Sequence, residues 1–211
     1  MPKKKRKVGS GTKRYYFSVK YLPAGADHDL LAGRCIHEMH LFMINNPQAM
    51  NKIGVTFPDW GFTSVGQRIA FVAESKEMLT ALSFQNYFSL MVSDGLFELS
   101  GVLEVPKTVR ELRFVRNQSI GKSFRGSKLR RMKRSIARAS ALGHALKIPQ
   151  AREERSIEHF HRVPISSGSS GQTYFLFTQK QVVNERSEAN FSSYGLATAQ
   201  ERRGTVPDLD L

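Results

Sequence analysis

Two histidines in one short segment are the first candidates for chemistry. His37 and His40 lie three residues apart, with Glu38 between them. A histidine titrates near neutral pH and can act as a general acid or base. Paired helical histidines that bind a metal are usually four residues apart and need a third ligand, which the sequence does not convincingly supply. We therefore expect no metal site. By position alone His40 is a candidate catalytic residue, with a structural role as the alternative; His159 and His161, in a polar stretch, give a weaker signal.

Positive charge is concentrated in one part of the 211-residue chain, whose formal net charge is +14. Between residues 107 and 138 there are twelve lysines and arginines against one acid, Glu111. Like charges this close repel one another, and bound phosphate groups relieve that repulsion. The stretch therefore favours binding to a nucleic acid, with a solvated basic surface as the alternative.

The most basic segment of this stretch is expected to form a helix at about residues 127–142. It contains no proline or glycine and consists of good helix formers. Apolar residues that recur every three or four positions would form one stripe, namely Leu129, Met132, Ile136 and Ala139. The rest of the surface would carry the basic side chains of Lys128, Arg130, Arg131, Lys133, Arg134 and Arg138. We expect such a helix to follow the phosphates of a nucleic acid.

The first eleven residues are interpreted as an addition to the native chain. The sequence MPKKKRKV is followed by Gly-Ser-Gly, and a basic cluster joined to such a linker is typical of a nuclear-localisation tag. It resembles the import signal of the simian-virus large T protein. Removing its five positive charges from the total of +14 leaves +9, so the rest of the chain is still strongly basic.

The composition of the remaining chain limits the class of protein. The single cysteine, Cys35, excludes an intramolecular disulfide and a cysteine-rich zinc site. No apolar run approaches the roughly 18 residues that a membrane span needs. We expect a soluble protein of a reducing compartment that does not bind membranes. Its length suits one large domain or two small ones.

The first part of the native chain, residues 12–106, reads as strand, helix, strand, strand, helix, strand. Asp27 is a plausible cap for the first helix, and Gly95 ends the second. The expected elements are residues 12–22, 27–45, 52–59, 65–73, 76–92 and 96–105. This βαββαβ order is that of the ferredoxin-like fold, which many RNA-binding modules share and which hosts many other activities.

The second part, residues 107–211, is less regular. It holds the basic helix, a polar connector and a strand at residues 172–179. The Ser/Gly-rich segment Ser166–Gly171 is interpreted as a tight binding loop, because strand-forming residues follow it directly. The predicted fold class is therefore α+β, with an N-terminal ferredoxin-like domain and a C-terminal part that contains an arginine-rich helix and short strands.

Five separated segments resemble one known family in the same order along the chain. They are LLAGRCIHEMH (30–40), IGVTFPDW (53–60), VRNQSI (115–120), the Ser/Gly loop running into GQTYFLF (171–177), and FSSYGL (191–196). The family is that of the CRISPR repeat-processing endoribonucleases of type I-F systems. The resemblance is strongest to the form that travels with Tn7-like transposons, and it extends over essentially everything after the tag.

The resemblance implies an enzyme that binds the hairpin of each CRISPR repeat and cuts at the 3′ base of the stem. The ribose 2′-OH attacks the phosphate without a metal or any other cofactor, giving a 2′,3′-cyclic phosphate. The enzyme then stays on its product as a subunit of the Cascade surveillance complex, beside the other type I-F subunits and possibly a transposition-targeting protein. It would meet target DNA only through that complex. It would be cytoplasmic in its native prokaryote, and nuclear when the tagged chain is expressed in eukaryotic cells.

The resemblance also implies roles for particular residues of a catalytic centre. The family's catalytic histidine falls on His40, with His37 in the same segment as the alternative position. The serine that holds the attacking ribose falls on Ser167, and Ser169 in the same loop is close enough to be an alternative. A tyrosine beside the site matches Tyr194, as a support for the histidine.

Further positions correspond to RNA contacts of the family. Arg116 and Gln118 match an Arg-x-Gln pair that reads purines at the foot of the stem, which suits the hydrogen-bonding groups of guanine and adenine. Tyr174 matches the aromatic residue that stacks on the terminal base pair, a phenylalanine in the best-known relatives. The basic helix matches an arginine-rich helix that lies in the RNA major groove. Its tail VPDLDL keeps only the Val-Pro of the family's ending.

Two other functions remain as alternatives to the enzyme. In a non-catalytic hairpin binder, the basic helix, Arg116, Gln118 and Tyr174 would function without His40 and Ser167. A generic DNA-binding or ribosomal protein would explain the charge but not the separated matching segments. The joint presence of the histidine, the serine loop and FSSYGL favours the enzyme.

Overall fold

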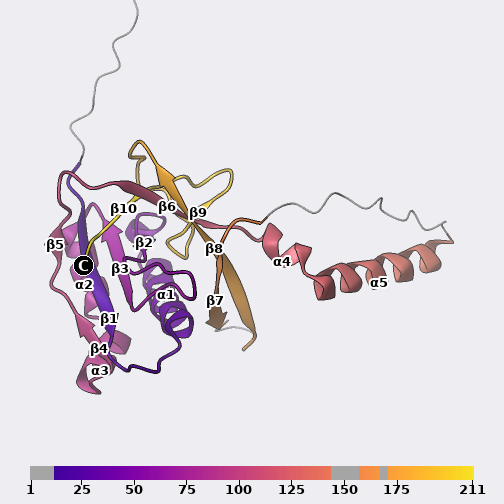
Figure 1. Cartoon of the computed structure of the whole chain (residues 1–211), viewed down its shortest axis with the longest axis horizontal. Coiled ribbons are helices and arrows are strands. Elements are labelled where there is room, and N and C mark those ends of the chain that lie inside the picture. The colour runs from indigo at the N-terminus through magenta and orange to yellow at the C-terminus, as the bar shows by residue number, and fades with distance from the viewer. Residues whose placement is uncertain (1–11, 144–156, 167–170) are drawn as a thin grey trace, which may run out of the picture.

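The structure is a computed structural model, and it describes residues 12–143, 157–166 and 171–211. The predicted tag and the serines Ser167 and Ser169 lie outside these residues. Within the described ranges no helix is both long and apolar enough to cross a membrane. The fold class is confirmed as α+β, with two five-stranded sheets packed against each other (Figure 1).

The first sheet has the strand order of a ferredoxin-like fold. It runs β2-β3-β1-β4, with β5 also paired to β1, and all its pairings are antiparallel. The elements are β1 (Tyr15–Tyr21), α1 (His28–Asn45), the 3-10 turn η1 (Pro47–Ala49), β2 (Gly54–Thr56), β3 (Arg68–Ala73), α2 (Lys76–Ser83), α3 (Asn86–Ser93), β4 (Phe97–Leu99) and β5 (Leu103–Glu104). Asp27 caps α1 by accepting the Leu30 amide, as predicted.

Two predicted elements are interrupted in the structure. The helix expected at residues 76–92 is two helices, because Gln85 takes an extended conformation. The change of direction lets Leu79 and Leu82 of α2 and Phe88 of α3 all be buried. The strand expected at residues 96–105 is split into β4 and β5. One extra residue is accommodated at Ser100–Gly101 opposite β1, as a β-bulge.

The second sheet is built from the later half of the chain, in the order β10-β6-β8-β7, with β9 pairing in parallel with β6. Its strands are β6 (Glu111–Arg116), β7 (His161–Ser166), β8 (Thr173–Val183), β9 (Ala197–Thr198) and β10 (Val206–Pro207). The strand expected at residues 172–179 is confirmed but longer, because β8 pairs with both β6 and β7. With eleven residues it is not one of the short strands expected in this part of the chain.

Helix α1 lies between the two sheets and contacts both. Gly33 makes the contact with β7 possible, since a Cβ added there would lie 1.9 Å from the carbonyl oxygen of Pro164. Buried residues of both sheets form one continuous hydrophobic cluster, in which Phe57 and Phe114 meet edge to face at 5.0 Å. The division into domains at residues 12–106 and 107–211 falls between the sheets and stays a prediction.

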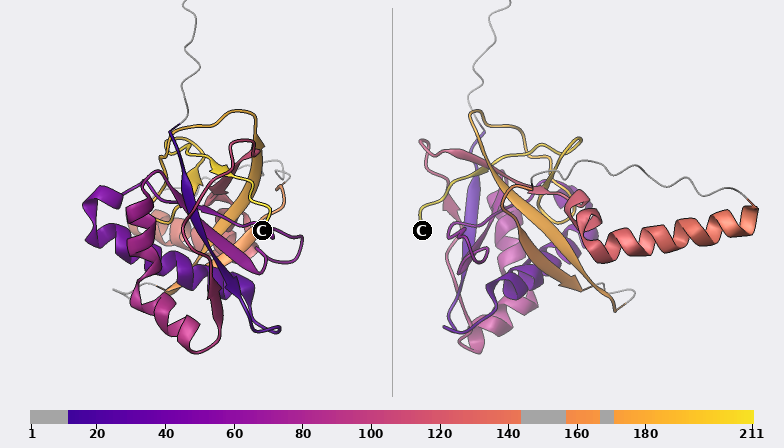
Figure 2. Two further views of the ribbon diagram at one scale, coloured as in Figure 1. Left: turned by 90° about the vertical axis from the view of Figure 1, so that its left-hand side faces the viewer. Right: turned by 45° about the vertical axis from the view of Figure 1, so that its right-hand side comes forward.

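The basic helix projects from this body (Figure 1; Figure 2, right). Two helices follow β6, namely α4 (Ser119–Ser123) and α5 (Arg125–Leu142). The predicted start near residue 127 is corrected to Arg125, and Gly143 ends the helix in the left-handed conformation, with φ of 63°. No residue of α5 is buried. The expected apolar stripe therefore packs on nothing among the described residues, with Leu129 half exposed and Met132 60% exposed.

The C-terminal tail is part of the folded body. Val206 and Pro207 pair with β6, and Leu209 is buried. The carbonyl oxygen of Pro207 accepts a hydrogen bond from Thr56 of the first sheet. The tail VPDLDL thus joins the two sheets, a structural role for which its sequence gave no signal.

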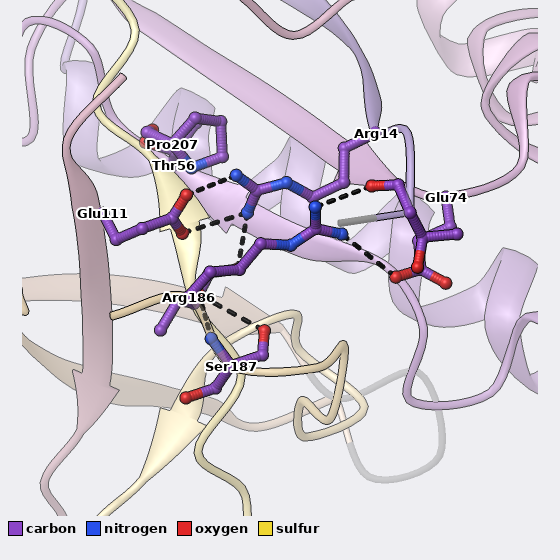
Figure 3. A network of polar contacts seen from close by, with 9 residues as sticks. Arg14, Thr56, Glu74, Glu111, Arg186, Ser187 and Pro207 are labelled. Atoms are coloured by element: carbon purple, nitrogen blue, oxygen red, sulfur yellow. Dashed lines mark hydrogen bonds and ion pairs between the residues drawn. The ribbon is translucent and has the colours of Figure 1, made fainter. Parts of the chain in front are cut away.

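A network of charged side chains also connects the sheets (Figure 3). Arg14 precedes β1, and its guanidinium forms a bidentate pair with Glu111 of β6, with Nη1 donating to Oε2 at 3.0 Å. Both side chains are about nine-tenths buried. Beside them, Arg186 donates to Glu74 at 3.2 Å and to the carbonyl of Thr12.

We expect this buried pair to be important for stability. Replacing Arg14 by alanine leaves the Glu111 carboxylate buried without its partner and should lower the free energy of unfolding by about 3–5 kcal/mol. The double replacement Arg14→Met/Glu111→Leu removes both charges and should recover most of that loss. Urea unfolding of the wild type and both variants measures this. A single variant as stable as the double one would contradict the expectation.

Candidate active site and nucleic-acid interface

His40 is held by a backbone carbonyl from the far end of the chain. It lies on α1, half-buried, with Nδ1 2.9 Å from the carbonyl oxygen of Ser193. A carbonyl oxygen only accepts, so Nδ1 carries the proton and the lone pair of the neutral ring is on Nε2. Nε2 is then free to take a proton from a bound molecule. His37, by contrast, has a buried Nδ1 with no hydrogen-bond partner among the described residues.

The ring of Tyr194 stacks on His40. The two ring centroids are 4.5 Å apart and the rings are 23° from parallel. Tyr194 belongs to a tight turn closed by the Gly195 amide, which donates to Ser192. Gly195 has φ of 69°, and a Cβ there would lie 2.6 Å from Val55. This turn therefore fixes both contacts to His40, the stacked ring and the carbonyl of Ser193.

Arg116 approaches the same tyrosine from β6. Its guanidinium lies over the Tyr194 ring, 5.1 Å from the centroid, in a cation–π contact. The amide oxygen of Gln118, at the start of α4, accepts from Nε and Nη2 of Arg116 at 2.6 Å each. In this arrangement Gln118 offers only its NH2 group to a ligand. Bidentate contact with adenine needs the oxygen as well, so it requires Gln118 to release Arg116.

Tyr174 of β8 completes the cluster. Its hydroxyl lies 2.5 Å from that of Tyr194, and the two rings meet edge to face at 6.3 Å. Burial, and then the hydrogen bond to Tyr194, raise the pKa of Tyr174 to about 12, so its hydroxyl stays protonated at neutral pH. The sequence pattern indicates stacking for this residue but not the hydroxyl contact, which a phenylalanine could not make.

The two possible functions of Tyr174 can be separated by substitution. Tyr174→Phe keeps the ring and loses one hydrogen bond, so we expect cutting to slow only about 2- to 10-fold, with hairpin affinity unchanged. Tyr174→Ala also removes the stacking surface and should weaken hairpin binding by about 10- to 100-fold. Single-turnover cleavage and equilibrium binding measure the two effects. Unchanged affinity in the alanine variant would exclude stacking on the RNA.

The structure thus brings five of the predicted site residues into one contact network, which we call the His40 cluster: His40, Tyr174, Tyr194, Arg116 and Gln118. Ser167 and Ser169 cannot be placed, because they lie outside the described residues. The loop that contains them connects Ser166 to β8, where Ser166 pairs with Thr173, the residue before Tyr174.

The predicted basic residues of α5 form the second half of the site. All of Lys128, Arg130, Arg131, Lys133, Arg134 and Arg138 lie on the exposed helix, and α5 contains no acid. A hollow of about 830 Å³ between α4 and α5 is lined by four of them: Arg130, Arg131, Lys133 and Arg134. Lys122 of α4 also lines it. Fixed positive charge around such a hollow suits a phosphate backbone.

The junction of α4 with the sheet sets where this basic surface begins. Gly121 lies directly on the ring of Phe177, since a Cβ there would come within 2.7 Å of it. Phe124, just before α5, contacts the same ring at 5.6 Å between centroids. The sequence pattern did not single out Lys122, Gly121 or Phe124. Their only signal was a position inside the basic stretch.

A ferredoxin-like sheet, a projecting basic helix and a histidine held with one nitrogen free together define a nucleic-acid-binding protein with a candidate catalytic centre. The sequence matches the model of the family described as CRISPR-associated protein (Cas_Csy4) over residues 16–209, and the chain belongs to that family. Its members are CRISPR endoribonucleases that process the repeat RNA and bind its hairpin. No curated protein matches the chain.

Proposed function

We propose that this protein cuts the CRISPR repeat at the 3′ base of its hairpin by a metal-independent attack of the upstream ribose 2′-OH. The observation that best supports this is the geometry of His40. The carbonyl of Ser193 fixes the proton on Nδ1, and the lone pair on Nε2 can accept the proton of a hydroxyl. A 2′-OH is a poor nucleophile at neutral pH, so a nearby base is the group that the reaction most needs.

The proposed step conserves all atoms and charges. The 2′-oxygen forms a bond to phosphorus as its proton passes to Nε2 of His40. The bond from phosphorus to the 5′-oxygen breaks, and that oxygen takes up a proton. The products are a 2′,3′-cyclic phosphate and a 5′-hydroxyl. In this scheme Tyr194 holds the imidazole in place by stacking, and Ser167 holds the attacking ribose.

The RNA contacts in this proposal extend from the His40 cluster to α5. Arg116 and Gln118 would read purines at the foot of the stem, and Tyr174 would stack on the terminal base pair. The basic residues of α5 would follow the phosphates along the major groove. An A-form major groove is deep and narrow, so a helix enters it more easily near the open end of a short hairpin.

The setting of the enzyme is also a proposal. By resemblance, the protein stays on its product as a subunit of a type I-F Cascade complex, of the form associated with Tn7-like transposons. It meets target DNA only through that complex and acts in the cytoplasm of its native prokaryote. The basic segment at the N-terminus, a nuclear-localisation tag in this interpretation, would direct the chain to a eukaryotic nucleus.

Incubation of the protein with candidate repeat hairpins in EDTA tests the function. We expect one cut at the 3′ base of the stem, a product with a cyclic phosphate, and no cutting of a hairpin with a scrambled stem. Binding of the cognate hairpin without any cut would instead indicate a non-catalytic hairpin binder. Failure to bind any repeat hairpin would contradict both.

A further inference from the structure

A second hollow, of about 640 Å³, lies on the opposite face of the β7–β8 hairpin from the His40 cluster. Tyr174 and Phe175 are neighbours on β8, so their side chains point to opposite faces of the sheet. Tyr174 faces Tyr194, whereas Phe175 lines this hollow. Phe124 also lines it, at the residue just before α5, so the hollow adjoins the start of the basic helix.

Exposed aromatic rings distinguish this hollow from an ordinary surface depression. The side chains of Phe62, Phe124 and Phe175 are 85%, 39% and 42% exposed. Phe62 stacks on the ring of His159, with centroids 5.0 Å apart and only 13° between the planes. The guanidinium of Arg162 lies over Phe175 at 5.7 Å from its centroid. Rings held in place by a neighbour, with one face open, form a stacking surface that costs little entropy to order.

We infer that this hollow binds unpaired nucleotides that flank the stem of the RNA held by α5, with bases stacked on Phe62 and Phe175. Aromatic faces beside a cation are the recurring features of sites for single-stranded nucleic acid. The choice of RNA as the occupant rests on the proposed function and on the continuity of the hollow with α5 through Phe124. A protein segment is the competing occupant, and the experiment below distinguishes it.

The charges at the rim restrict how a nucleotide can enter. Asp27 and Asp29 line one side, and each already accepts a backbone amide, from Leu30 and Val65. Their carboxylates disfavour a phosphate inside the hollow but can still accept hydrogen bonds from the amino groups of adenine, cytosine or guanine. Bases would therefore point inward while phosphates stay outside, near Arg162.

Binding of three RNAs tests the inference: the hairpin alone, the hairpin with a short single-stranded 5′ extension, and the hairpin with a 3′ extension. All carry a 2′-deoxy sugar at the cut so that none is cleaved. We expect one extension to tighten binding to the wild-type protein. Phe62→Ala and Phe175→Ala should each reverse this gain, by about 10-fold, and leave affinity for the bare hairpin unchanged. Phe84→Ala is the matched control, because Phe84 is 75% exposed but lies between α2 and α3.

The outcomes separate this inference from the proposed function. If the bare hairpin binds but no extension adds affinity, or if Phe62→Ala and Phe84→Ala behave alike, the hollow is not an RNA site and the proposed function is unaffected. An unstructured oligoadenylate is the remaining probe. If the protein binds it in a manner dependent on Phe62 but binds no hairpin, the hollow is an RNA site and the proposed function is wrong.

Discussion

Replacing His40 by alanine is expected to reduce cleavage of the repeat hairpin by about 100- to 10,000-fold, which is the usual contribution of a general acid or base. The substitution removes the Nε2 lone pair and the stacking partner of Tyr194. It leaves α5 and the reading pair Arg116 and Gln118 in place, so hairpin affinity should change little. Single-turnover cleavage and equilibrium binding of the same RNA measure the two quantities.

His37 provides the matched control for this experiment. It lies on the same helix, three residues away, but makes none of the contacts of the His40 cluster. His37→Ala should therefore cut at nearly the wild-type rate. An inactive His37→Ala beside an active His40→Ala would show that the catalytic histidine has been assigned to the wrong position.

Charge reversal on α5 is expected to have the second large effect, on binding. The double variant Arg130→Glu/Arg134→Glu places two acids one turn apart on the side of α5 that lines the basic hollow. It should weaken hairpin binding by about 100-fold and lower the steepness of the salt dependence by about two phosphate contacts. Because α5 contains no acid, the new carboxylates relieve repulsion within the helix and should not unfold it.

A control with the same change of net charge separates local contacts from the general field of the protein. Lys52 and Lys76 are exposed and lie on the first sheet's side of the molecule, away from α5. The variant Lys52→Glu/Lys76→Glu also lowers the net charge by four. We expect it to weaken binding only slightly. Equal losses in both double variants would mean that α5 makes no specific contact with the phosphates.

The order of elements in the first sheet could be predicted because its signals are local. The Asp27 cap and the alternation in β1 belong to single segments of the chain, and both are confirmed. The break between α2 and α3 could not be predicted in this way. It depends on where Leu82 and Phe88 find buried partners, and packing of this kind overrides helix propensity.

Strands of the second sheet were harder to predict for physical reasons. β6 reads as part of a basic stretch, yet Arg113 is buried there because its guanidinium donates to the carbonyl of Arg203. β7 contains Pro164, which argues against a strand. It is tolerated because β7 pairs only with β8 and is an edge of the sheet. Both strands depend on partners that are distant in sequence.

The candidate site shows the same limit. His40 and Ser193 are 153 residues apart, and no periodicity in the sequence brings them together. Only the ordered resemblance to a known family pointed to His40, Tyr194 and Tyr174 as one site. The aromatic hollow had no such guide, because isolated residues such as Phe62 and Phe175 form a surface only after the chain has folded.

A single 2′-deoxy substitution tests the proposed mechanism most directly. The nucleotide upstream of the cut is replaced by its 2′-deoxy form, and the wild-type protein is incubated with this hairpin in EDTA. The proposal predicts binding as tight as that of the all-ribose hairpin and no cut at that position, since the attacking oxygen is gone. Continued cutting at the same bond would require a different nucleophile and would contradict the role proposed for His40.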